Sequence, residues 1–119
     1  MDLHVLCKTQ FSFLTDDFGV SWVQFYDIPE ATIKNCSKIY IYFNATKPPI
    51  LSGEILGSYK AGSTHKKQEK NEDRVGIVFH AYKPYDVGKL DHVHWPTKAE
   101  KESEEAPKYR PYSRSWATD

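Results

Sequence analysis

Apolar residues occur along the chain in short blocks of strand length, and turn-forming residues separate the blocks. Phe11 and Phe13 alternate with polar neighbours, which is the period of a half-buried strand, and residues 20–26 predict a second strand. Between them, residues 16–19 combine two aspartates with Gly19, a residue that adopts positive φ without strain. We therefore expect a β-hairpin near the N-terminus.

The clearest strand signal covers residues 38–43, where every residue after the first is β-branched or aromatic. A continuous apolar run of this kind is typical of a central strand that is covered on both faces. Residues 50–59 predict the next strand, in which Gly53 and Gly57 indicate a bulge or a corner. Residues 75–82 predict a further strand.

Helical signals are sparse. Asp27 lies near an N-cap position, Pro29 suits the first turn of a helix, and Asn35 would end it. Regularly spaced strands with at most one or two short helices predict a mainly β fold, either a small barrel or a rolled antiparallel sheet of five to six strands. We expect one β-rich domain over residues 1–95. A C-terminal tail then covers residues 96–119, first polar and then rich in arginine and aromatic residues.

The composition is typical of a folded domain. Aromatic residues make up 14% of the 119 residues, which a disordered chain would not contain. The 16 basic residues balance the 16 acidic ones, so no net charge draws the chain to nucleic acid or to a membrane. No apolar run approaches the roughly 20 residues that cross a bilayer, and the N-terminus lacks the features of a signal peptide. We expect a cytoplasmic protein with no membrane partner.

The sequence offers no motif for a cofactor. Cys7 and Cys36 are too few for a disulfide scaffold, and we expect half-buried thiols in a reducing compartment. No cysteine cluster has the spacing of a zinc site, and no strand is followed by a Gly-Lys-Ser/Thr phosphate loop. We therefore expect no cofactor.

Lysine is concentrated in the middle of the chain. Residues 31–67 hold six lysines against a single acid, whereas residues 1–30 hold five acids and one lysine. Lysines bind phosphate and aromatic rings stack on bases, which favours a nucleic-acid surface. The lysines expected to contact phosphate are Lys34, Lys38, Lys47, Lys60, Lys66 and Lys67, and the aromatic residues expected to line a cleft are Trp22, Tyr40, Tyr42 and Trp95. The alternative is that these charges are solvated on edge strands and loops.

The end of the chain interleaves aromatic and basic residues. The basic residues are Lys108, Arg110 and Arg114, and the aromatic ones are Tyr109, Tyr112 and Trp116. Such a segment can contact nucleic acid, with Arg110 and Arg114 on phosphates. The same residue types are enriched in protein interfaces, so the tail is also expected to pack on its own domain, on a partner protein or on a second copy.

His92 and His94 flank Val93, and side chains two residues apart on a strand point to the same face. Two neutral imidazoles on one face can bind a divalent metal. The spacing resembles the His-hydrophobe-His motif of rolling-circle replication and relaxase endonucleases. This resemblance implies a metal-dependent DNA nickase with Tyr109 or Tyr112 as the nucleophile. The other interpretation places both histidines on an edge strand beside a packing tryptophan.

The middle of the chain bears a second resemblance. A strand of β-formers over residues 36–43 is followed by a proline-bearing loop, and a second strand then opens with Gly53 and Glu54. Over residues 36–59 this is similar to the core hairpin of the PUA-like superfamily, which includes ASCH and EVE domains. The resemblance implies a pocket for RNA or a modified base. The N-terminal Gly-x-Lys-x-x-Glu signature of ASCH domains is absent, and a generic β-hairpin would show the same pattern.

Together these features predict a small non-enzymatic binding module that binds nucleic acid, either RNA or single-stranded DNA, through lysines and aromatic residues. The first alternative is a protein–protein adaptor, such as a small viral or accessory protein, that acts as an oligomer. The second alternative is the metal-dependent nickase.

Overall fold

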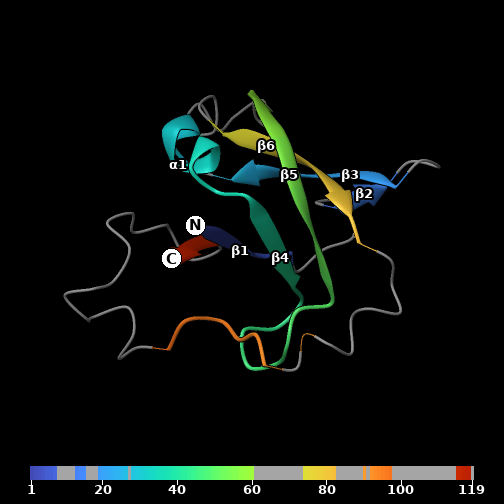
Figure 1. Ribbon diagram of the computed structural model, residues 1–119, viewed down its shortest axis with the longest axis vertical. Helices are drawn as coiled ribbons and strands as arrows, with labels where there is room; N and C mark the ends of the chain where they lie inside the picture. Colours follow the sequence, from blue (N-terminus) through green and yellow to red (C-terminus); the bar gives the residue numbers. More distant parts are fainter. Residues whose placement is uncertain are drawn as a thin grey trace, which may run out of the picture.

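The computed structural model describes residues 1–7, 13–15, 19–26, 28–60, 74–82, 90, 92–97 and 115–118. These residues form a mainly β fold, as the strand spacing predicts, with one short helix beside a single sheet (Figure 1). The strands are β1 (Asp2–Leu6), β2 (Phe13–Thr15), β3 (Val20–Tyr26), β4 (Lys38–Tyr42), β5 (Leu51–Lys60), β6 (Val75–Ala81) and β7 (Ser115–Thr118), and the helix is α1 (Glu30–Lys34). That helix is far too short to cross a bilayer, and no described helix could do so.

The described strands form a seven-stranded sheet in the order β2-β3-β6-β5-β4-β1-β7. The sheet is mixed, because β1 and β4 run parallel while the remaining neighbours run antiparallel. The parallel pair arises because the chain leaves β1, builds the β2–β3 hairpin and α1, and returns beside β1 in the same direction. The strand order ends at β2 and β7, so the described sheet is rolled and open, and the closed barrel does not form.

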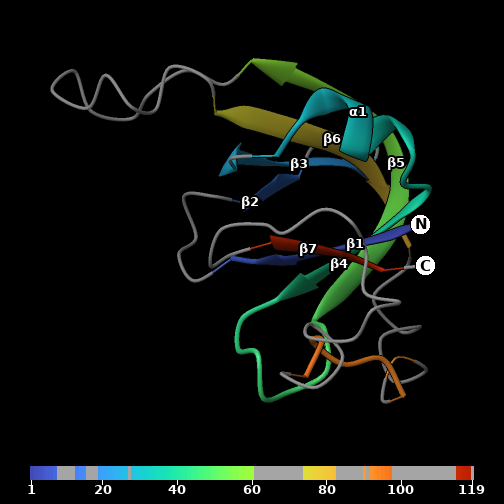
Figure 2. The same cartoon turned by 90° about the vertical axis from the view of Figure 1, so that its left-hand side faces the viewer.

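Figure 2 shows the sheet strongly curved, with β6, β3 and β2 on one arm, β4, β1 and β7 on the other, and β5 along the bend. The bend coincides with a shift in register between Ile55 and Gly57, which leaves Leu56 as the extra residue of a bulge. The glycine spacing therefore predicted this irregularity correctly. Gly53 has a separate role, since a Cβ there would lie 2.5 Å from the backbone oxygen of His80.

The two faces of the sheet bury different side chains, because residues alternate between the faces along each strand. The inner face holds the main core, to which β1 contributes Leu3 and Val5, β4 contributes Ile39 and Ile41, and α1 contributes Ile33. A second cluster on the outer face contains Leu6, Tyr42, Trp95 and Trp116, with Tyr40 packed against it.

The N-terminal hairpin and the helix form where the sequence places them. β2 pairs antiparallel with β3, and Gly19 adopts the positive φ of 80° that the turn was expected to need. The helix ends at Asn35, as predicted, and begins after Pro29 without a side-chain cap. Asp27, the expected N-cap, lies outside the described residues.

The end of the chain returns to the sheet. β7 pairs antiparallel with β1, so residues from the predicted tail extend the sheet beside the first strand. Both chain ends consequently lie side by side in Figures 1 and 2. Trp116 packs in the outer cluster and Ala117 in the main core, so these four described residues are anchored on both faces.

Candidate nucleic-acid interface

A depression of about 420 Å³ lies between α1 and the bulged half of β5. It is lined by Glu30, Ile33, Lys34, Cys36, Ile55, Leu56, Gly57 and Ser58. Its volume falls in the range of roughly 300–1,000 Å³ that is usual for small-molecule sites, and its lining mixes apolar walls with a few polar groups.

Local structure explains why the depression opens here. Ile33 is 2% exposed in the core and anchors the helix, so Glu30 and Lys34, four residues apart, share a more exposed side of α1. Across from the helix, the bulge turns Leu56 outward until it is 56% exposed. A Cβ at Gly57 would meet no atom within 4 Å, so the strand beside the depression is open to approach.

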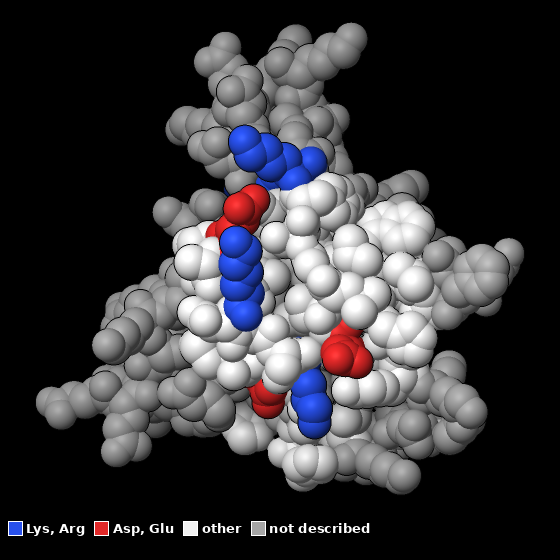
Figure 3. Space-filling view, turned by 45° about the horizontal axis from the view of Figure 1, so that its top comes forward, with Lys and Arg blue, Asp and Glu red and all other residues white. Residues whose placement is uncertain are grey.

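Basic side chains follow the same half of β5. Lys34 lines the depression, and Lys60 ends β5 two residues beyond Ser58. Arg74 directly precedes Val75, which is the register partner of Lys60. Figure 3 shows basic side chains gathered at one end of the described surface, whereas basic and acidic side chains alternate over the rest of this view. Lys34 is therefore the basic residue of the lining and Glu30 its acidic residue, while Lys60 and Arg74 lie near each other beyond the end of the lining.

The other predicted lysines lie elsewhere. Lys38 is exposed on β4, where its register partners are the acids Asp2 and Glu54. Lys47 is exposed between β4 and β5, at the opposite end of β5 from Lys60. The remaining predicted basic contacts fall outside the described residues, namely Lys66, Lys67, Arg110 and Arg114.

The structure brings three of the four predicted aromatic residues together. Tyr42 and Trp95 meet edge to face with ring centroids 5.4 Å apart, and Tyr40 packs against the same cluster. Tyr42 is fully buried and Trp95 is 9% exposed, so neither presents a ring face to a base. Tyr40 is only partly buried. Trp22 is also partly buried, but it lies on β3, which β6 and β5 separate from β4.

A buried hydrogen bond holds this aromatic cluster. The Tyr42 hydroxyl lies 2.6 Å from Nδ1 of His4, and the His4 ring stacks on Tyr40 with centroids 5.2 Å apart. Burial, and to a lesser extent the charge on Tyr40 when ionised, raises the pKa of Tyr42 above its ordinary value. The phenol therefore stays protonated at neutral pH, which suits a structural cluster.

The histidine pair is not arranged as the sequence predicts. His92 and His94 are both exposed and belong to no strand. The Val93 N–H donates instead to the Leu90 carbonyl in a local turn, so the expectation that the pair shares one strand face is wrong. No group of three or more histidine, cysteine or acidic side chains that could hold a metal occurs among the described residues. Tyr109 and Tyr112 lie outside those residues.

Both cysteines are free thiols in the main core. They are more buried than the sequence suggests, at 2% exposure for Cys7 and 6% for Cys36. Cys36 also lines the depression, where burial raises the pKa of its thiol, so the thiol stays protonated at neutral pH.

Sequence reasoning named Lys34 and Lys60 but missed the other residues of this site. The missed residues include Glu30, Leu56 and Ser58 of the lining, and Arg74 beside the end of β5. One signal was available, because the glycine spacing of β5 predicted a bulge, and bulges commonly occur beside functional sites. The packing of α1 against the bulge has no counterpart in the sequence pattern.

Comparison of the chain with protein-family models, curated proteins and solved structures gave no match. The segment that resembles the PUA-like superfamily does fold as a hairpin, since β4 and β5 pair antiparallel.

Proposed function

We propose that the protein is a small binding module for single-stranded nucleic acid, with the depression between α1 and β5 as its binding site. The observation that carries the proposal is the position of Lys34, which lines a depression beside β5, the strand that ends at Lys60. Arg74 adjoins Val75, the register partner of Lys60. In this arrangement the depression receives a base, and the three cations contact the adjoining phosphates.

The lining supports a base as the occupant. Ile33, Ile55 and Leu56 offer apolar surface, and the Glu30 carboxylate and Ser58 hydroxyl offer the few polar groups that orient a ligand. A membership in the PUA-like superfamily fits the same proposal, because the resemblance implies a pocket for RNA or a modified base.

The proposal is tested by fluorescence anisotropy of labelled single-stranded RNA and DNA oligonucleotides. We expect binding at low salt that weakens as salt rises. Three phosphate contacts on a single strand correspond to a slope of log K against log salt of about −2. Lys34→Glu and Lys60→Glu should each weaken binding by at least about tenfold, since each replaces a phosphate contact with a repulsive charge.

Lys47→Glu is the matched control, because it makes the same charge change at an exposed site outside the depression. It should change the affinity much less than Lys34→Glu. Absence of binding by the unmodified protein at low salt, or an equal loss in all three variants, would contradict the proposal.

A protein-binding role is the second candidate, and one observation favours it. Phe43, Ile50 and Tyr82 are exposed by 53%, 39% and 39%. They lie at neighbouring strand ends, because Phe43 follows β4, Ile50 precedes β5 and Tyr82 follows β6. Apolar and aromatic side chains of this kind are typical of protein interfaces.

A further inference from the structure

Three polar side chains line the depression and are available to a ligand there. Glu30 and Lys34 come from α1, and Ser58 comes from β5. Glu30 and Lys34 lie one helical turn apart, the spacing at which an acid and a base often pair. Within the described part of the chain, however, the side chains of all three residues make neither a hydrogen bond nor an ion pair.

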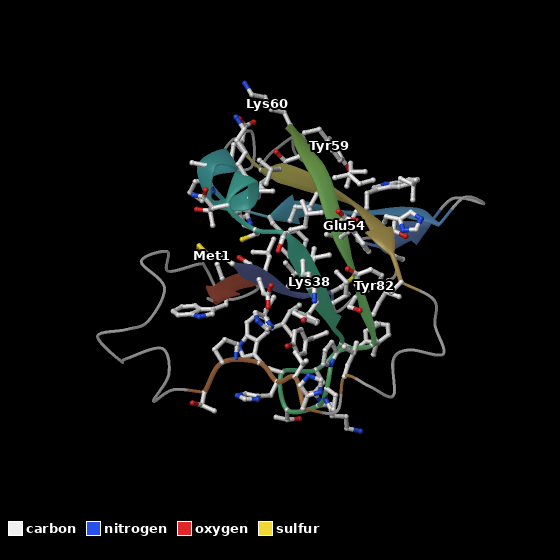
Figure 4. All side chains as sticks on the ribbon, in the orientation of Figure 1. Met1, Lys38, Glu54, Tyr59, Lys60 and Tyr82 are labelled. Carbon is white, nitrogen blue, oxygen red and sulfur yellow. The ribbon has the colours of Figure 1, made fainter. Side chains whose placement is uncertain are left out.

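The strand wall of the depression is the part of β5 that extends past β4. The register of β5 with β4 runs only as far as Glu54, whereas residues 57–60 pair with β6 and with no described strand on the side of α1. Figure 4 shows that this half of β5, which carries Tyr59 and Lys60, runs beside the helix. A flat ligand therefore has access between the helix and a strand edge that no described strand covers.

A carboxylate in such a site distinguishes between bases. It accepts hydrogen bonds at both of its oxygens and donates none. Guanine is the base with two N–H donors side by side, one at N1 and one on the N2 amino group. Adenine and cytosine each place an acceptor nitrogen beside the amino group, and uracil and thymine carry a single N–H between two carbonyls. Guanine is therefore the base that offers a donor to each carboxylate oxygen.

We infer that the depression selects guanine, and that Glu30 is the residue that determines this specificity. The Glu30 carboxylate accepts hydrogen bonds from N1–H and from the N2 amino group, and the Ser58 hydroxyl donates to O6. Ile33 and Ile55 supply apolar surface for the purine ring. The inference rests on the proposed function, because it names the base that the proposed site binds.

Charge alone would give Glu30 the opposite effect. An acid beside phosphates repels them, so Glu30→Gln would strengthen binding to every oligonucleotide if Glu30 acted only through its charge. A glutamine amide has one acceptor oxygen and one NH₂ donor, so its NH₂ group would face a donor of guanine. If Glu30 reads guanine, the same substitution lowers the affinity for guanine relative to the other bases. The ratio of these affinities separates the two roles.

Competition binding measures this ratio with single-stranded oligonucleotides, all RNA or all DNA, that differ at one base. In a pyrimidine background, one guanine should give about tenfold tighter binding to the unmodified protein than one adenine, as a bidentate pair usually does. Glu30→Gln should abolish that preference. Glu54→Gln makes the same change at an exposed acid outside the lining and should keep it. Circular dichroism checks that both variants are folded.

Inosine tests the contact at a single group, because it lacks the N2 amino group of guanine but keeps N1–H and O6. Replacing the guanine by inosine should weaken binding several-fold for the unmodified protein and much less for the Glu30→Gln protein. Binding without a preference for guanine, or a preference that Glu30→Gln leaves intact, would overturn the inference and leave the proposed function standing. Absence of any binding would overturn both.

Discussion

Two glycines of β5 lie in opposite surroundings, which gives a matched test of packing at single residues. A Cβ at Gly53 would press on the backbone of His80 and the ring of Phe79, at 2.5 Å and 2.6 Å, whereas one at Gly57 would meet no atom within 4 Å. We expect Gly53→Ala to lower the free energy of unfolding by about 1–3 kcal/mol, because the backbone must shift.

Gly57→Ala serves as the control and should change the free energy of unfolding by no more than about 0.5 kcal/mol. Urea unfolding followed by tryptophan fluorescence measures both variants. Equal losses of stability in the two variants would contradict the difference in space around the two glycines.

The buried phenol of Tyr42 supplies a second prediction, for stability at neutral pH. Tyr42→Phe removes the hydroxyl that lies 2.6 Å from His4 Nδ1, and should lower the free energy of unfolding by about 1–3 kcal/mol. Tyr82→Phe is the control, because its phenol is 39% exposed, and it should change the free energy of unfolding by about 0.5 kcal/mol at most. The comparison fails if both variants unfold at the same urea concentration.

The same phenol should make the protein sensitive to alkali. Burial raises the pKa of Tyr42 in the folded protein, whereas in the unfolded chain the phenol loses its proton at about pH 10. Above that pH the folded state binds more protons than the unfolded state, so stability falls as the pH rises. Tyr42→Phe should therefore flatten the loss of stability above about pH 10, which urea midpoints between neutral and alkaline pH would measure. An unchanged slope would contradict the burial of this group.

At the scale of elements, β7 tests whether the end of the chain belongs to the sheet. Removal of residues 115–119 takes Trp116 out of the outer cluster and Ala117 out of the main core, and it uncovers the edge of β1. We expect a loss of about 3–5 kcal/mol, the usual effect of deleting a large buried aromatic side chain. A truncated protein that unfolds at the same urea concentration would show that β7 adds nothing to the fold.

The local elements were predictable from the sequence because their signals are local. The run at 38–43, the glycine at position 19 and the prolines near residues 29 and 48 each act through the backbone of their own segment. The sequence pattern does not carry the pairing of β1 with β4, because parallel strands meet only through a long crossover.

The candidate site was predictable only in part for the same reason. Lys34 and Lys60 were identified from composition, but 26 positions separate them, and it is the docking of α1 beside the β5 bulge that brings their segments together. Tyr42 and Trp95 have the composition of a stacking surface, yet they are buried against each other. Burial depends on the packing of distant segments, which spacing along the chain does not show.

At the scale of the whole molecule, the rolled sheet assigns different surfaces to different tasks. Its inner face buries the main core, whereas the depression opens where α1 packs beside the bulge of β5.

The most direct test of the proposed binding site is an NMR titration of ¹⁵N-labelled protein with a short single-stranded oligonucleotide. We predict that amide shifts change most within residues 30–36 and 55–60, which include the lining of the depression, and at Arg74 beside the end of β5. Amides of the turn that contains Lys47 should change little. Shifts confined to residues outside this group, or no shifts at low salt, would contradict the assignment of this depression as a nucleic-acid interface.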